Sequence, residues 1–153
     1  MLLPFQYQWF QRRWNQQAVQ HYELETMWAS GMSRGHVLAE VRDNRIVAGV
    51  DLDTGQPLNP NKPLAASAYV SIDNLFLIIR KQYRPATSWR SQLARYDRGL
   101  ALKLDPCAAP LPNISYDAEF GYPTSINYQA SPCMLPFNGA NLFLTIARFR
   151  PLP

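Results

Sequence analysis

The 153-residue sequence is poor in charge, glycine and cysteine, and it has no long hydrophobic run. Charged residues make up 17%, below the roughly 25% of an average soluble domain, whereas hydrophobic residues make up 47%, too many for a disordered chain. No run reaches the roughly 20 apolar residues that a membrane-spanning helix requires. We therefore expect a single domain over residues 1–153 that is either soluble or peripheral to a membrane.

Motifs for cofactors and metals are also scarce. The two cysteines, Cys107 and Cys133, are too far apart for a Cys-x-x-Cys motif, and His21 and His36 show no ligand spacing with them. Glycine-rich phosphate loops are missing. We therefore predict no cofactor and no metal site. Nucleic acid is not favoured as a partner, because no recognition motif accompanies the basic residues.

One triplet invites an enzymatic interpretation. Asp53-Thr54-Gly55 matches the active-site triplet of aspartic proteases, whose mechanism needs two carboxylates that share a proton. The chain has no second triplet, and Gln56 stands where a small or hydroxyl residue usually follows. A polar turn at the end of a strand is the simpler interpretation. A small hydrolase or protease-like enzyme built on Asp53 stays as the alternative.

Hydrophobic periodicity outlines the first half of the fold. Apolar residues at helical spacing predict an amphipathic helix over residues 5–20, with core positions Tyr7, Phe10, Trp14 and Ala18. A strand over residues 22–28 and a hairpin turning at Asp43-Asn44 follow. In that hairpin, the core face pairs Val41 with Ile46, Ala39 with Ala48 and Val37 with Val50. The wet face carries Glu40, Arg42, Arg45 and Asp51.

The second half continues with a loop over residues 56–68 and a helix capped by Ser71. The apolar stripe of this helix is Ile72, Leu75, Phe76, Ile79 and Tyr83. Ser88 begins a second helical piece, residues 114–118 and 124–128 form a hairpin, and residues 141–150 form the last strand. The fold class is therefore α+β, with a mostly antiparallel sheet of about six strands and helices packed on one side. The strands form a three-stranded meander, then a hairpin plus the last strand.

The second hairpin carries a turn of specific composition. Pairing Ile114 with Tyr128 and Tyr116 with Ile126 leaves Phe120, Gly121, Tyr122 and Pro123 as the turn. We expect Gly121 to adopt a positive φ and Pro123 to fix the return of the chain. On this basis Gly121→Ala costs on the order of 1 kcal/mol or more.

The cysteines lie on extensions of both strands of this hairpin, so we predict a structural disulfide between Cys107 and Cys133. A loop of about 25 residues contributes roughly 3 kcal/mol in the chain-entropy model, and only in an oxidising compartment. Two buried free thiols are the alternative. Thiol titration of the unreduced, denatured protein distinguishes the two. Two reactive thiols would rule out the bond and the argument for export that depends on it.

The net charge of +4 is unevenly distributed along the chain. Residues 80–105 hold seven cations and two acids, an excess of +5 that leaves −1 for the rest. Because arginine, tryptophan and tyrosine dominate interface energetics, we predict that partner binding uses Arg84, Trp89, Arg90, Arg95, Tyr96 and Arg98. A solvated face, or packing of this segment onto the sheet, is the competing interpretation.

These observations favour a non-catalytic protein-interaction module, or an accessory subunit of a larger assembly, whose partner has an acidic surface. A ligand-binding module that uses one face of the sheet is a second alternative. Peripheral membrane association stays open.

The segment Tyr116–Ile126, YDAEFGYPTSI, resembles the hairpin signature of domain-of-unknown-function family 6174. The rest of the chain follows the family's order, with Trp14 in a helix before a Tyr22-led strand, the hairpin AEVRDNRIV (39–47) and the capped helix SIDNLFLII (71–79). The resemblance covers about residues 9–149. It implies a small α+β domain, common in exported bacterial proteins, with no known activity to transfer.

Two departures from the family are visible. Residues 26–35 lack the Cys-x-Cys pair that members often carry, and residues 87–104 look like a basic insertion, where we expect specialised function. The first residues show no signal-peptide pattern. An exported or cell-envelope location is therefore favoured only by the resemblance and the predicted disulfide.

Overall fold

The computed structural model describes residues 5–31, 33–59, 69–82, 112–129 and 141–153. Within them lie the helices α1 (Phe5–Gln17) and α2 (Ile72–Gln82) and the strands β1 (His21–Ser30), β2 (Ser33–Arg42), β3 (Arg45–Asp51), β4 (Asn113–Tyr116), β5 (Pro123–Tyr128) and β6 (Leu142–Pro151). The strands form one sheet in the order β3-β2-β1-β6-β5-β4, and every pairing is antiparallel. The predicted α+β class with a six-stranded antiparallel sheet is confirmed.

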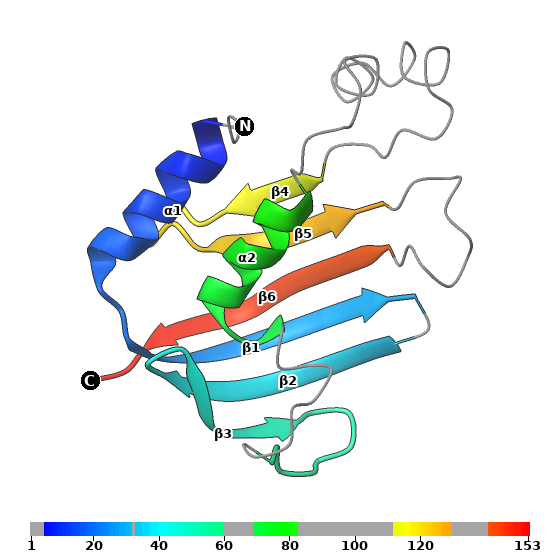
Figure 1. Ribbon diagram of the computed structural model, residues 1–153. Coiled ribbons are helices and arrows are strands. Elements are labelled where there is room, and N and C mark those ends of the chain that lie inside the picture. The colour runs from blue at the N-terminus through cyan, green and yellow to red at the C-terminus, as the bar shows by residue number, and fades with distance from the viewer. Residues whose placement is uncertain (1–4, 32, 60–68, 83–111, 130–140) are drawn as a thin grey trace, which may run out of the picture.

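The last strand joins the two halves of the sheet. β6 lies between β1 of the meander and β5 of the hairpin, so segments from both ends of the chain pair along its length (Figure 1). Its buried side chains Leu142, Leu144 and Ile146 alternate with exposed ones, as expected for a strand with one face on the core. β1 and β6 are neighbours in the sheet although they lie at opposite ends of the sequence, so tertiary pairing determines this strand order.

The β2–β3 hairpin turns where the sequence predicts. Asp43 and Asn44 have φ of 49° and 61°, the backbone of a two-residue turn that suits twisted strands. Val41 pairs with Ile46 as expected, but the register shifts beyond it, and the predicted pairings of Ala39 and Val37 are wrong.

A bulge causes this shift. Val47 has no partner in the ladder, so Ala39 pairs with Gly49, Leu38 with Val50, and Val37 with Asp51. One extra residue exchanges the two faces of the strand beyond it. Val50 therefore shares a face with Leu38, away from the core, and Asp51 moves to the opposite side from Arg45.

The β4–β5 hairpin has a longer turn than predicted. Ile114 pairs with Ile126 rather than Tyr128, and Tyr116 pairs with Pro123 rather than Ile126. Asp117 explains the difference, because its Oδ1 accepts hydrogen bonds from the backbone N–H groups of Glu119 and Phe120 at 2.9 and 2.7 Å.

The turn therefore begins at Asp117, whose N–H donates to the carbonyl of Tyr122 at 2.8 Å. Pro123 opens β5 instead of standing within the turn. The positive φ expected at Gly121 is confirmed, at 87°.

Helix α1 is held to the rest of the fold by its aromatic residues. Tyr7 and Trp14 are buried, and Phe10 stacks on Tyr116 with ring centroids 4.4 Å apart. Ala18, expected in the core, is exposed and has a φ of 50°. The helix ends at Gln17, so Ala18 occupies the left-handed position that follows many helices.

Helix α2 begins at the predicted cap. Ser71 Oγ accepts a hydrogen bond from the backbone of Asn74 at 3.5 Å, and the hydroxyl also bonds to the Asn44 side chain. Four of the five expected stripe residues are buried, namely Ile72, Leu75, Phe76 and Ile79. Tyr83, the loop beyond residue 59, the helical piece from Ser88 and the insertion 87–104 lie outside the described residues.

Tyr22 of β1 receives the first N–H of α2. The backbone of Ile72 donates to its hydroxyl at 3.0 Å, and burial raises the pKa of Tyr22 to about 12. The folded state therefore favours the neutral phenol of Tyr22. The unfolded chain keeps the ordinary tyrosine pKa of 10, so this contribution to the free energy of unfolding is fully present below pH 10.

We expect the free energy of unfolding to fall as the pH rises from about 10 to 12, with Tyr22 contributing roughly 2–3 kcal/mol of that loss. Urea denaturation across this range should show a shallower pH slope for Tyr22→Phe, whatever its stability at pH 7. An unchanged pH slope in the Tyr22→Phe variant would mean that other groups cause the loss of stability at alkaline pH. Tyr7 and Tyr122, whose pKa values burial also raises, are the groups to replace next.

Candidate functional site

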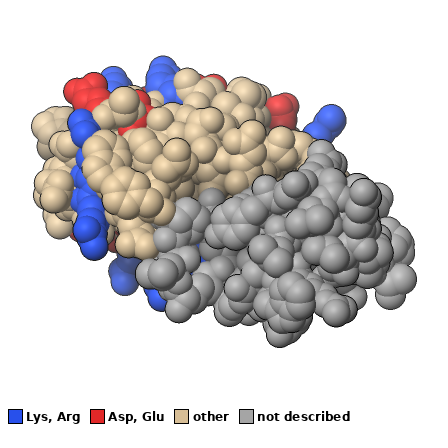
Figure 2. Space-filling model, turned by 90° about the horizontal axis from the view of Figure 1, so that it is seen from above, with Lys and Arg blue, Asp and Glu red and all other residues tan. Residues whose placement is uncertain are grey.

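One face of the central strands is not buried. On β1, buried residues alternate with His21, Glu23, Glu25 and Met27, and the register extends this face across β2, β3 and β6. We call this surface the open face and define it by His21, Glu23, Glu25, Met27, Ala29, Arg34, His36, Leu38, Glu40, Arg42, Arg45, Phe143, Thr145, Arg148 and Arg150. Seen from above, acidic and basic side chains both appear along the upper edge of the molecule, and further basic side chains lie at its left and lower left (Figure 2).

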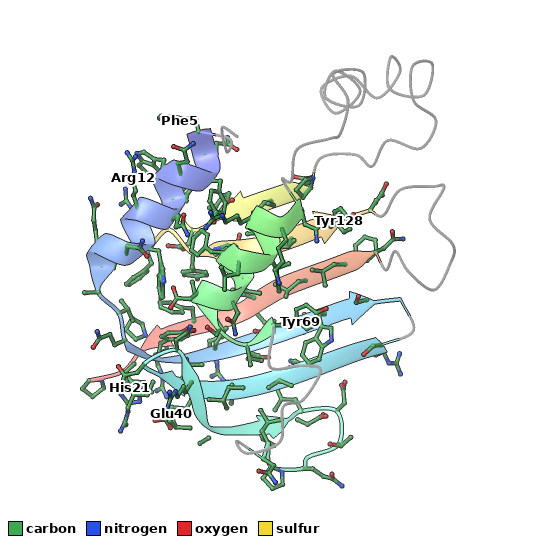
Figure 3. The ribbon with its side chains drawn as sticks, viewed as in Figure 1. Phe5, Arg12, His21, Glu40, Tyr69 and Tyr128 are labelled. Carbon is green, nitrogen blue, oxygen red and sulfur yellow. The ribbon has the colours of Figure 1, made fainter. Side chains whose placement is uncertain are left out.

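Two histidine–glutamate pairs cross the β1–β2 boundary. His21 Nε2 lies 2.7 Å from Glu40 Oε1, and the two side chains point toward one another (Figure 3). Farther along, His36 Nε2 lies 2.8 Å from Glu25 Oε1. Both pairs join residues of the two strands that share this face, so the register of the sheet brings them together.

Arginines of β2 and β6 lie beside three glutamates of this face. Arg150 lies 3.2 Å from Glu23, and Arg148 lies 3.8 Å from Glu23 and 3.5 Å from Glu25. Arg42 lies 3.6 Å from Glu40. The three glutamates are thus the negative partners of arginines from β2 and from β6.

The charged side chains of this network differ in exposure. The Glu23, Glu25 and Glu40 side chains are 20–34% exposed, whereas those of Arg42, Arg148 and Arg150 are 54–62% exposed. The arginine side chains of this network are therefore more exposed to solvent than the glutamate side chains.

An open hollow of about 520 Å³ lies at one end of this surface. It is lined by Met27, Trp28, Ala29, Arg34, Gly35, His36, Asp53, Phe143 and Thr145. Met27 and Phe143 are among the large apolar side chains that stay exposed. Gly35 is required here because a Cβ atom would lie 2.2 Å from the Trp28 indole, which packs over it.

The Asp53-Thr54-Gly55 triplet forms an exposed turn after β3. Asp51 Oδ1 accepts the backbone N–H groups of Asp53 and Thr54 at 2.9 and 3.0 Å, and Gly55 has a φ of 73°. The Asp51 side chain thus organises this turn, and Gly55 supplies its positive φ. Asp53 also stands at the rim of the hollow.

The structure describes three of the predicted site residues, Gly121, Tyr122 and Pro123. Arg84, Trp89, Arg90, Arg95, Tyr96 and Arg98 lie outside the described residues, and so do Cys107 and Cys133, so partner binding and the disulfide stay predictions. The predicted turn residues Gly121, Tyr122 and Pro123 are described, and they serve the fold rather than the open face. Among the described residues, no group of three metal-ligating side chains is assembled and no helix is long and apolar enough to span a membrane.

A family model described as a family of unknown function (DUF6174) matches residues 6–100, well over half of the chain. The chain belongs to DUF6174. This confirms the family expected from the sequence. The DUF6174 match contains α1, the β1–β3 meander and α2 but ends before the YDAEFGYPTSI hairpin, so the hairpin resemblance rests on its residues alone. A search of curated proteins found no match.

Sequence reasoning predicted the part of the open face on the β2–β3 hairpin, with Glu40, Arg42 and Arg45, but missed the part on β1 and β6. Charge summed along the chain assigns the basic excess to residues 80–105, whereas this face draws its arginines from three separated strands. The available signal was the period-two alternation of charged residues in β1 (HYELE) and β6 (ARFR). It indicates a polar face for each strand but not that the two strands are neighbours.

Proposed function

We propose that this DUF6174 protein is a non-catalytic interaction module, or an accessory subunit of a larger assembly, whose open face binds an acidic protein surface. The proposal includes packing of both helices on the opposite side of the sheet, which leaves this face free for a partner. Its main support is the difference in exposure between the arginine side chains, at 54–62%, and the glutamate side chains, at 20–34%. An approaching partner meets arginine first.

The count of charges agrees with this choice of partner. The open face carries five arginines and three glutamates, an excess of two positive charges with histidine neutral. Exposed guanidinium groups bind carboxylates in bidentate geometry, and complementary charge steers association. The basic segment predicted at residues 84–98 would add to the same preference.

The hollow supplies an apolar anchor point within this charged surface. Binding energy at protein interfaces concentrates in a few apolar or aromatic side chains that enter such depressions. Met27 and Phe143 offer the contact area, and Arg34 stands beside them. We therefore expect the partner to present an apolar side chain next to acidic residues.

The test uses poly-L-glutamate as a model of an acidic protein surface. We expect fluorescently labelled poly-L-glutamate to bind in a salt-sensitive manner, and the double variant Arg148→Gln/Arg150→Gln to raise the Kd roughly three- to tenfold. Arg12→Gln/Lys81→Gln, which removes the same charge from the helices, is the matched control. Equal weakening by both double variants would mean that net charge alone governs binding, and the proposal would then be wrong.

A ligand-binding module is the second candidate, favoured by the volume and lining of the hollow. Small-molecule sites commonly measure about 300–1,000 Å³ and combine apolar walls with a few polar groups. Anilinonaphthalene sulfonate, which pairs aromatic rings with an anionic group, is a suitable probe. Phe143→Ala should abolish saturable dye binding if the hollow is the site, whereas Arg148→Gln/Arg150→Gln should leave it unchanged.

A further inference from the structure

The two helices leave several apolar side chains exposed. Phe5 is 80% exposed, and Trp9, one turn later on α1, is exposed as well. Leu77 is the corresponding exposed residue of α2. Phe5 and Arg12 both lie on the side of α1 that faces away from the sheet (Figure 3). Single exposed apolar residues are common on protein surfaces, but Phe5 and Trp9 lie one turn apart on the same helix and can be contacted together.

Cations accompany these apolar residues. The sequence contains no acid before Glu23, so the charged residues of α1 are the two cations Arg12 and Arg13. The Arg13 guanidinium lies over the Trp9 ring, 5.2 Å from its centroid. Helix α2 adds the exposed Arg80 and Lys81. We call Phe5, Trp9, Arg12, Leu77, Arg80 and Lys81 the helical surface.

Three acids lie near these cations, and two of them are engaged by other groups of the protein. Asp73 of α2 is turned inward, where its carboxylate accepts the Trp14 Nε1–H at 3.0 Å. Asp117 is engaged with the backbone of its own turn. Glu119 is exposed, and its carbonyl receives Arg13 Nε at 2.8 Å, beside the C-terminal half of α1 rather than beside Phe5.

We propose that the helical surface binds an anionic lipid bilayer, with Phe5 and Trp9 in the headgroup region and the cations against lipid phosphates. Aromatic residues flanked by arginine and lysine are the composition of interfacial membrane contacts. The apolar side chains stand apart on convex helices, so a fluid surface accommodates them without the shape complementarity that a protein interface needs. This proposal is independent of the open face, which lies on the sheet.

The experiment is sedimentation of the full chain with vesicles of phosphatidylcholine alone or of equal amounts of phosphatidylcholine and phosphatidylglycerol. We expect binding to the mixed vesicles only, weakened by salt. Trp9→Gln and Arg12→Gln/Lys81→Gln should each reduce the bound fraction several-fold. Because these side chains are exposed, circular dichroism and unfolding curves should match those of the wild type.

Arg148→Gln/Arg150→Gln is the matched control, since it removes two charges from the open face and should leave vesicle binding unchanged. Binding of both vesicle types alike, failure to bind the mixed vesicles, or equal losses with both double variants would each overturn the proposal. The open-face double variant should weaken poly-L-glutamate binding alone, and the helical double variant should weaken vesicle binding alone. A double variant that weakens only the other ligand shows that its surface has been assigned wrongly.

Discussion

Gly121→Ala should lower the free energy of unfolding by roughly 2–4 kcal/mol, more than the cost of a positive φ alone. Gly121 has a φ of 87°, and a Cβ atom there would lie 2.8 Å from the carbonyl oxygen of Phe10 and 3.0 Å from Cβ of Arg13. Both atoms belong to α1, which rests directly on the hairpin turn. The substitution therefore strains the turn and also pushes the helix away.

Gly55→Ala is the matched control for this prediction. Gly55 also has a positive φ, 73°, but a Cβ atom there would meet nothing within 4 Å. Its replacement should cost only about 1 kcal/mol, the conformational part of the effect. Urea denaturation of both variants separates the two contributions. Equal losses would show that α1 does not press on the turn.

Trp14→Ala should cost roughly 3–5 kcal/mol, as expected for removal of a buried aromatic side chain that joins several elements. The Trp14 ring packs edge-on against Tyr22 of β1 and Phe149 of β6, with centroids 5.7 and 5.8 Å away. Its Nε1–H donates to Asp73 of α2 at 3.0 Å. One side chain thus connects both helices with the two central strands.

Two further variants keep this prediction testable if Trp14→Ala does not fold. Trp14→Phe retains most of the buried ring but leaves Asp73 without its donor, so a loss of about 1–3 kcal/mol is expected. Trp9→Ala removes an exposed tryptophan from the same helix and should change stability by less than about 1 kcal/mol. A loss at Trp9 as large as that at Trp14 would contradict the role assigned to the buried ring.

Local features of the fold could be predicted wherever neighbouring residues determine them. The Asp43-Asn44 turn, the Ser71 cap, the apolar stripe of α2 and the positive φ of Gly121 depend on backbone preferences and on periodicity within a few residues. The turn, the cap, four of the five stripe residues and the positive φ were found at their predicted positions.

Register and strand neighbours could not be predicted in the same way. The Val47 bulge exchanges the faces of β3 beyond it, and the Asp117 turn moves the β4–β5 pairing by two residues. Both depend on which backbone hydrogen bonds form, and the competing registers differ little in the energy of their local interactions. A period-two pattern alone is compatible with several registers.

The sequence by itself determined the elements, the α+β class and the family, because propensity, periodicity and motif are properties of contiguous residues. Only the tertiary structure decided that β6 lies beside β1, which sets Arg148 and Arg150 over Glu23 and Glu25. The same holds for Trp14 between two helices and two strands. The ion pairs of Arg148 and Arg150 and the Trp14–Asp73 hydrogen bond join residues more than fifty positions apart. Long-range packing selects such contacts because it buries apolar surface while charged groups keep access to water or to a partner.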